Sequence, residues 1–193
     1  MRRLLLPLSS LVLALCFAQA ATATTVLRVP LDEMARKSTL VLHGTIRSST
    51  VVAIADNPRH LRTDVVVDVV EVLKGPRSTR TLTLELPGGQ RGAWAMRIPG
   101  MPSFREGEEV VLFLEKTASN WALTGLGQGK FTVESTAEGT KRVRRHLDGL
   151  HFVGFDARGK LVAITAPLDD PNLSLTALLA SVKTALTTRP QGR

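Results

Sequence analysis

Residues 61–73 have the sequence LRTDVVVDVVEVL, and this stretch decides the predicted fold. Apolar and polar residues alternate along it, as in a strand with one buried face. The apolar set occupies odd positions through Val69 and even positions from Val70 onward. A one-residue slip turns side chains to the opposite face unless a β-bulge absorbs it. We predict a bulge near Val69 and Val70 that lets the strand curl around a small barrel; the alternative is a strand buried on both faces.

Further strands are predicted on both sides of this stretch. Residues 110–114 are all apolar, which fits a central strand at 109–115 with both faces covered. Residues 81–86 show the cleanest alternation in the chain. The other predicted strands are residues 40–46, 51–55, 121–126, 130–134, 141–147, 151–155 and 161–164.

Two helices flank the predicted strands. A short one is expected at residues 31–37, where acidic residues come first and basic residues last, as the helix dipole favours. A longer amphipathic helix is expected at about 174–187, where leucine and valine recur at helical spacing after the N-cap candidate Ser174.

The first twenty residues have the pattern of a secretory signal peptide. Arg2 and Arg3 precede an apolar run at residues 4–17, and Ala18-Gln19-Ala20 follows it. We predict cleavage after Ala20, with Ala23 as the alternative, and export to the periplasm or the extracellular space. The run is shorter than the roughly twenty residues that span a bilayer, so no retained transmembrane segment is expected.

Residues 21–193 are then predicted to form a single, mainly β domain. Cys16 is the one cysteine of the chain and lies in the predicted leader, so disulfides and thiol chemistry are excluded from this domain. Loss of Arg2 and Arg3 lowers the formal net charge from +8 to +6. This excess is compatible with an acidic partner, although it does not require one.

The long connection at residues 87–106 is rich in glycine and proline, which predicts irregular structure. Connections of this length are often functional. Trp94 lies between Arg91 and Arg97, and a tryptophan in such a place is either an interface anchor or a cap folded onto the barrel. We expect the binding surface in this connection.

Three stretches carry a family resemblance: STLVLHGTI at 38–46, VDVVEVLKG at 67–75 and PSFREGEEVVLFL at 102–114. Together they are similar to a set of uncharacterised exported bacterial proteins and, in outline, to the netrin and tissue-inhibitor-of-metalloproteinase module. The resemblance covers about residues 38–134. It implies an OB-like, five-stranded Greek-key barrel, a fold that usually binds rather than catalyses. Those inhibitors chelate zinc with an N-terminal cysteine that is missing after Ala20, so their activity is not implied.

The sequence predicts no metal site and no cofactor. The four histidines lack the spacing of metal ligands, and His43 is expected to be a surface strand residue. The sequence GLGQGK at 125–130 superficially resembles a phosphate loop, but Thr124 and Phe131 stand where glycine and a hydroxyl residue are needed. We predict a tight turn there instead. The histidines are His43, His60, His146 and His151.

A basic run, KRVRRH at 141–146, is the remaining candidate site. On a strand, Arg142 and Arg144 share one side, so only part of the run faces any one ligand. The alternative is a solvated hairpin edge that its charges protect from aggregation. Aromatic residues do not interleave with the basic ones, so no nucleic acid is expected as a partner.

These observations predict an exported, noncatalytic binding protein that contacts a protein or an anionic envelope component through residues 88–104. The first alternative is a peptidase-directed inhibitor or accessory protein. The second is a hydrolase whose site is assembled from residues distant in sequence. The sequence leaves the oligomeric state open. The predicted binding residues are Arg91, Trp94, Arg97, Phe104, Arg142 and Arg144.

Overall fold

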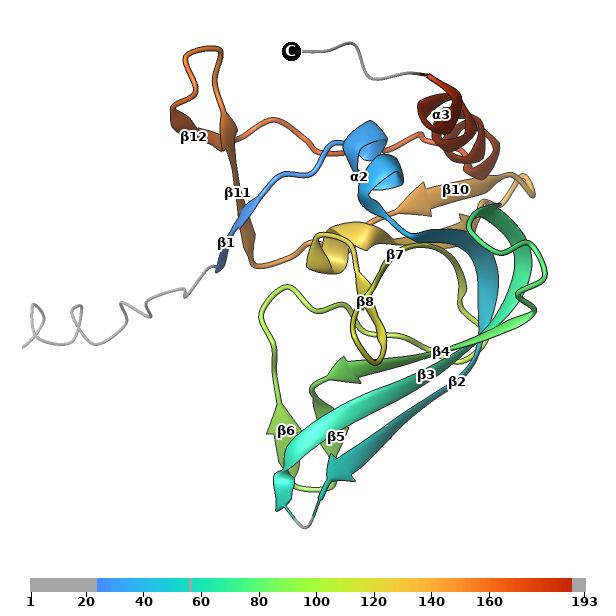
Figure 1. Cartoon of the computed structure of the whole chain (residues 1–193), viewed down its shortest axis with the longest axis vertical. Helices are drawn as coiled ribbons and strands as arrows, with labels where there is room; N and C mark the ends of the chain where they lie inside the picture. The colour runs from blue at the N-terminus through green and yellow to red at the C-terminus, as the bar shows by residue number, and fades with distance from the viewer. Residues whose placement is uncertain (1–23, 56, 189–193) are drawn as a thin grey trace, which may run out of the picture.

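The computed structural model describes residues 24–55 and 57–188, and over these ranges the chain is mainly β (Figure 1). Its strands form a seven-stranded, a three-stranded and a two-stranded sheet. No helix within these ranges combines the length and the apolar character needed to cross a bilayer. The predicted leader at residues 1–20 and the alternative cleavage site at Ala23 lie outside the described residues.

The large sheet is built around a long antiparallel hairpin of β2 (Leu40–Ile54) and β3 (Asn57–Lys74). The strand order is β10-β9-β7-β2-β3-β4, and β8 pairs with β7. The sheet is curved (Figure 1), but no ladder in the described chain joins its two end strands, so the predicted barrel is not confirmed. The other strands are β4 (Thr81–Pro87), β7 (Glu109–Lys116), β8 (Trp121–Leu123), β9 (Lys130–Ser135) and β10 (Lys141–Arg144).

The predicted bulge in β3 is confirmed. His43 pairs with Glu71 and Gly44 pairs with Val69, so Val70 is the extra residue in the ladder. The Val70 side chain is 68% exposed, which contradicts burial of both faces at this point. A Cβ atom on Gly44 would lie 2.4 Å from the carbonyl oxygen of Asp68, so β3 approaches β2 here more closely than a side chain permits.

Both faces of the large sheet are covered around β7. One face carries the main hydrophobic cluster, which includes Leu42, Val67, Leu84 and Leu112. The opposite face packs against two helices that lie on the same side of the sheet (Figure 1), α2 (Leu31–Lys37) and α3 (Leu175–Thr187). The central position predicted for the strand at 109–115 is therefore confirmed.

Both helices begin where their sequence signals indicate. α2 has the predicted bounds. In α3 the Ser174 hydroxyl accepts a hydrogen bond from the Ala177 N–H at 3.1 Å, which confirms Ser174 as the N-cap.

The three-stranded sheet consists of β1 (Thr24–Leu27), β11 (Leu150–Phe155) and β12 (Leu161–Ile164). β1 pairs in parallel with β11, and no strand was predicted at residues 24–27. Gln128 ties this sheet to the large one: its side-chain oxygen accepts from Val29 N–H at 2.9 Å, and its side-chain nitrogen donates to Leu27 O at 3.0 Å. Gln128 belongs to η1 (Leu126–Gly129), so the turn predicted at 125–130 is confirmed.

The connection between β4 and β7 is more regular than predicted. β5 (Gly89–Arg91) and β6 (Trp94–Met96) form a short antiparallel hairpin. Gly92 supplies its turn with a φ of 59°, a conformation that glycine adopts without strain. The glycines that were expected to prevent regular structure here therefore make a hairpin possible.

Candidate binding groove

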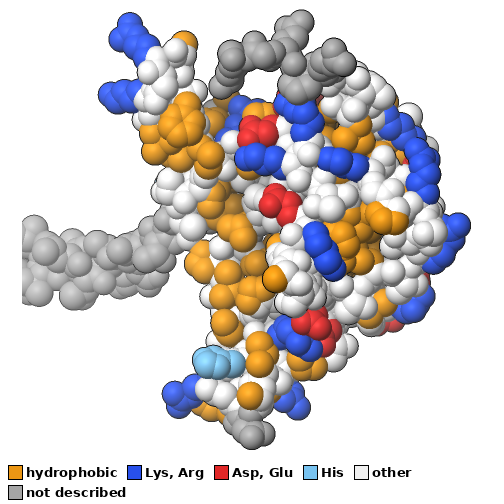
Figure 2. All heavy atoms as spheres, in the orientation of Figure 1, with side chains coloured by type: hydrophobic (Ala, Val, Ile, Leu, Met, Phe, Trp, Pro, Cys, Tyr) orange, Lys and Arg blue, Asp and Glu red, His pale blue; other side chains and the backbone are white. Residues whose placement is uncertain are grey.

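Residues 88–104, here called the 88–104 segment, form one wall of a groove of about 700 Å³. The opposite wall comes from β2, β3 and β4 through Val51, Thr63 and Leu86. Ligand sites commonly have volumes of about 300–1,000 Å³. Figure 2 shows hydrophobic side chains gathered along this part of the surface. The side chains that the segment contributes include Met96, Arg97, Ile98, Met101 and Phe104.

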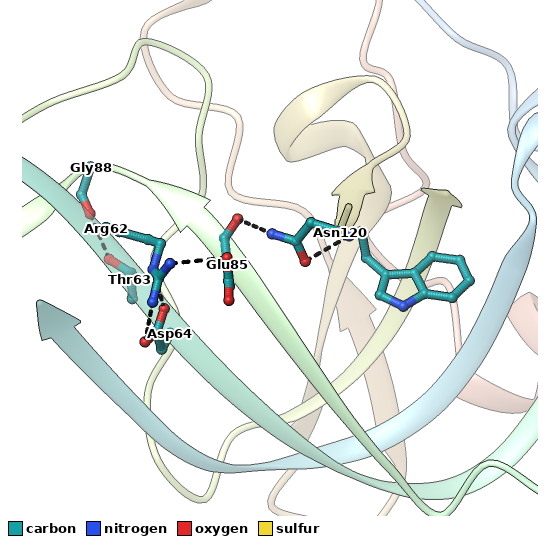
Figure 3. Close-up of polar contacts among 7 residues, drawn as sticks. Arg62, Thr63, Asp64, Glu85, Gly88 and Asn120 are labelled. Carbon is teal, nitrogen blue, oxygen red and sulfur yellow. Dashed lines mark hydrogen bonds and ion pairs between the residues drawn. The ribbon is translucent and has the colours of Figure 1, made fainter. Parts of the chain in front are cut away.

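The beginning of the 88–104 segment is fastened to β3 (Figure 3). The Thr63 hydroxyl donates to Gly88 O at 2.7 Å, and Gly88 N–H donates to Leu61 O at 2.8 Å. Gly89 has a φ of 135°, and a Cβ there would lie 2.7 Å from a Val51 methyl carbon. Only glycine lets the chain lie this close to the β2–β3 hairpin.

A second network in Figure 3 braces the strands beneath the groove. Arg62 of β3 reaches Glu85 of β4, with Nη1 3.0 Å from Oε2, and donates from Nη2 to Asp64 at 3.0 Å. Asn120, just before β8, donates from its side-chain nitrogen to Glu85 O at 2.9 Å. This bond links the residue before β8 to β4, two strands that no β-ladder joins among the described residues. The network thus steadies β4, from which the 88–104 segment continues.

The far half of the segment is held by two further contacts. Gly127 N–H donates to Gly100 O at 2.8 Å, and Lys130 Nζ donates to Ser103 O at 2.7 Å. Phe104 follows directly and is only 7% exposed within the main hydrophobic cluster. The 88–104 segment is therefore held at its beginning, at Gly100 and near its end.

Lys130 belongs to a buried polar cluster beside the groove. Its Nζ lies 2.6 Å from Glu108 Oε1, and its side chain is 5% exposed. Thr132 Oγ1 also donates to Glu108 Oε1, at 2.7 Å, and Arg105 N–H donates to the other carboxylate oxygen at 3.1 Å. These residues line a cavity of about 410 Å³ that shares Pro102, Ser103 and Asp148 with the groove. The cluster therefore lies next to the groove.

The contacts within this cluster favour the ionised form of Glu108. Burial lowers the pKa of Lys130, and its contact with Glu108 opposes that effect. Burial would raise the pKa of Glu108, but hydrogen bonds from Lys130 and Thr132 outweigh it and hold the pKa below its usual range. The Lys130 donors are directed at Glu108 and Ser103 O, so this arrangement fastens the segment.

The expectation that His43 is a surface residue is wrong. Its Nε2 lies 2.7 Å from Glu109 Oε1, and the residue is 8% exposed. Lys141 Nζ contacts the same carboxylate at 2.7 Å. Burial would raise the pKa of Glu109, but the hydrogen bonds from Lys141 and His43 outweigh it and lower the pKa. Pairing with a carboxylate on the neighbouring strand makes burial of the imidazole favourable.

The six predicted binding residues fall into three groups. Arg97 lines the groove. Phe104 lines the groove and is only 7% exposed, because it also packs in the main hydrophobic cluster; its role as a binding residue stays a prediction. Arg91 and Trp94 lie on the β5–β6 hairpin, and Arg142 and Arg144 lie on β10; none of these four lines the groove.

Trp94 and the basic run need separate corrections. Trp94 is 43% exposed and the Arg59 guanidinium carbon lies 4.9 Å from its ring centroid, which contradicts the alternative of a cap folded onto a barrel. The free edge expected at β10 is instead covered by the chain before α3, since Val143 N–H donates to Leu173 O at 2.9 Å. Arg145 pairs with Asp169, which neutralises part of the run.

Sequence reasoning missed the residues that hold the groove together. Lys130 opens an apolar strand, and a lysine at such a position indicates a buried partner. Thr63 and Asn120 gave no signal, because their partners are backbone carbonyls of segments distant in sequence.

No protein-family model matches the chain, and neither a curated protein nor a solved structure matches it. Function is therefore inferred from the groove and its chemistry.

Proposed function

We propose that the chain is an exported, noncatalytic binding protein whose groove receives an extended segment of a protein partner. The observation that carries this proposal is the construction of the groove wall. The 88–104 segment is largely irregular, yet hydrogen bonds hold it at Gly88, Gly100 and Ser103. A wall ordered in advance costs little entropy on binding, which raises affinity.

The groove lining suits a peptide. Met96, Ile98 and Met101 offer apolar and adaptable surface, and methionine in particular conforms to different side chains. Arg97 and Asp148 place one charge of each sign on the lining. The net positive charge of the chain favours encounter with an acidic partner. The signal-peptide pattern supports export.

The same proposal includes an OB-like architecture. The five strands β4, β3, β2, β7 and β9 form a continuous, curved ladder (Figure 1), and the bulge at Val70 increases the local twist. The Asn120 bond to Glu85 O connects the strands across the open side. OB-folds are partly open barrels, so this arrangement supports the resemblance without a closed ladder.

Photocrosslinking in cells that export the chain tests the function. A photoreactive amino acid at Ala95, which lines the groove, should capture a partner protein, which mass spectrometry would identify. The matched position is Ala93, which is exposed in the hairpin turn but does not line the groove. Ala95→Trp fills the groove and should abolish binding of the identified partner, whereas Ala93→Trp should preserve it.

Two results would overturn the proposal. Equal crosslinking from Ala93 and Ala95 would show that the groove has no part in partner binding. Hydrolytic turnover by the purified protein that Ala95→Trp abolishes would replace the noncatalytic function with the hydrolase alternative.

A further inference from the structure

The three-stranded sheet has one apolar face that remains exposed. Ladder partners share a face and alternate residues do too, so Leu27, Val153, Phe155, Leu161 and Ala163 lie together. Leu27 is 46% exposed, Phe155 66% and Leu161 52%. Scattered exposed apolar residues are ordinary, but a contiguous group on one face indicates an interaction site.

Basic side chains surround the same end of this sheet. Arg158 and Lys160 lie in the turn between β11 and β12, and Arg28 follows Leu27, with its N–H bonded to Val153 O at 2.8 Å. All three are exposed, and none is in an ion pair with another described residue. Figure 2 shows hydrophobic side chains over the β11–β12 hairpin with Lys or Arg side chains at its tip.

The acidic residue of this turn bonds to the backbone and not to the basic side chains. Asp156 Oδ1 accepts the backbone N–H groups of Arg158 and Lys160, each at 2.9 Å. The one carboxylate of the turn thus shapes the backbone. Figure 1 shows this hairpin extending away from the large sheet.

We propose that this face and the turn at residues 156–160 form a docking surface for an anionic phospholipid bilayer. Phe155, Leu161 and Leu27 enter the boundary between headgroups and acyl chains, while the three cations contact lipid phosphates. This surface is separate from the groove, since none of these residues lines it.

Charge complementarity favours a bilayer over a second copy of the chain. Two-fold association through this face would bring the same three cations together, which opposes binding. A stable protein interface also buries about 800 Å² on each partner, whereas this face offers only a few large apolar side chains. A bilayer needs only shallow insertion and opposite charge.

Vesicle sedimentation tests the proposal with the processed protein, which begins at Ala21. The protein should bind vesicles of equal parts phosphatidylglycerol and phosphatidylcholine, and bind pure phosphatidylcholine vesicles far less. Arg158→Gln and Lys160→Gln should each weaken binding about fivefold. Phe155→Ser should weaken it about tenfold. Val70→Ser, at an equally exposed valine of the large sheet, is the matched control and should bind normally.

A fluorescent label locates the contact. Residues 21–193 contain no cysteine, so Ala157→Cys carries a single environment-sensitive dye at the tip of the turn. Its emission should shift to the blue with anionic vesicles, whereas a dye at Ala137→Cys, in the exposed turn between β9 and β10, should not respond. Equal shifts, or full vesicle binding by Phe155→Ser, would refute the proposal. A dimer that Phe155→Ser dissociates, without vesicle binding, would assign the face to a second copy.

Discussion

Lys130→Met is the substitution that most directly tests how the 88–104 segment is held. Methionine preserves the volume of the side chain but removes the ammonium that lies 2.6 Å from Glu108 Oε1 and 2.7 Å from Ser103 O. Removing one partner of a buried ion pair costs about 3–5 kcal/mol. The Glu108 side chain retains 14% exposure, so water relieves part of the loss and we expect about 3 kcal/mol.

Urea unfolding of residues 21–193 measures this loss. With a slope of about 2 kcal/mol per molar urea, the midpoint should fall by about 1.5 M. Lys183→Met is the matched control, because Lys183 pairs with Glu71 at 2.8 Å on the surface, with side chains 56% and 41% exposed. Such pairs contribute at most about 1 kcal/mol.

A double-mutant cycle separates the ion pair from other effects of the substitution. Glu108→Gln combined with Lys130→Met should destabilise the protein less than the sum of the single variants, because no uncompensated charge remains. If Lys130→Met lowers the midpoint no more than Lys183→Met, the buried pair does not hold the segment and the account of the groove wall is wrong.

Three further predictions use the same unfolding assay. Phe104→Ala should cost about 3–5 kcal/mol, since this residue fills the core; a loss below about 1 kcal/mol would contradict its packing in the core. The pKa of Glu108 is lowered in the folded protein. The contribution of Glu108 to the free energy of unfolding is therefore complete above its ordinary pKa of 4.5, and it is lost as the pH falls through the lowered value. Glu108→Gln should therefore flatten the acid side of the stability profile, and an unchanged slope would contradict the lowered pKa. Gly44→Ala should cost about 1–3 kcal/mol, because the added Cβ meets Asp68 O. Val70→Ala at the bulge should change the free energy of unfolding by no more than about 0.5 kcal/mol. Equal effects would show that β2 and β3 are not in close contact at Gly44.

The local elements were predictable wherever a short-range pattern carries the signal. The phase change from Val69 to Val70 located the bulge, because a two-residue period cannot shift without an extra residue. The apolar run at 110–114 indicated the central strand, and Ser174 with its following leucines indicated α3. Each of these signals depends on neighbours within a few residues.

The candidate site was predictable only as a region. Glycine, proline and length marked the connection at 87–106 as unusual, but they did not reveal the hairpin or the burial of Phe104. His43 was misplaced for a related reason: its polarity predicts exposure, while the carboxylate that makes burial possible lies on β7, 66 residues away in sequence.

The amino-acid sequence by itself determined the β-rich character of the chain, the bulge, the two helices and the position of the unusual connection, because these depend on periodicity and local backbone preference. Only the tertiary structure decided that the large sheet stays open, that Lys130 and Thr63 turn the 88–104 segment into a groove wall, and that Leu27 joins Phe155 and Leu161 on an exposed face. These outcomes depend on pairings between segments far apart in sequence, and no local pattern encodes which strand or carbonyl a side chain will meet.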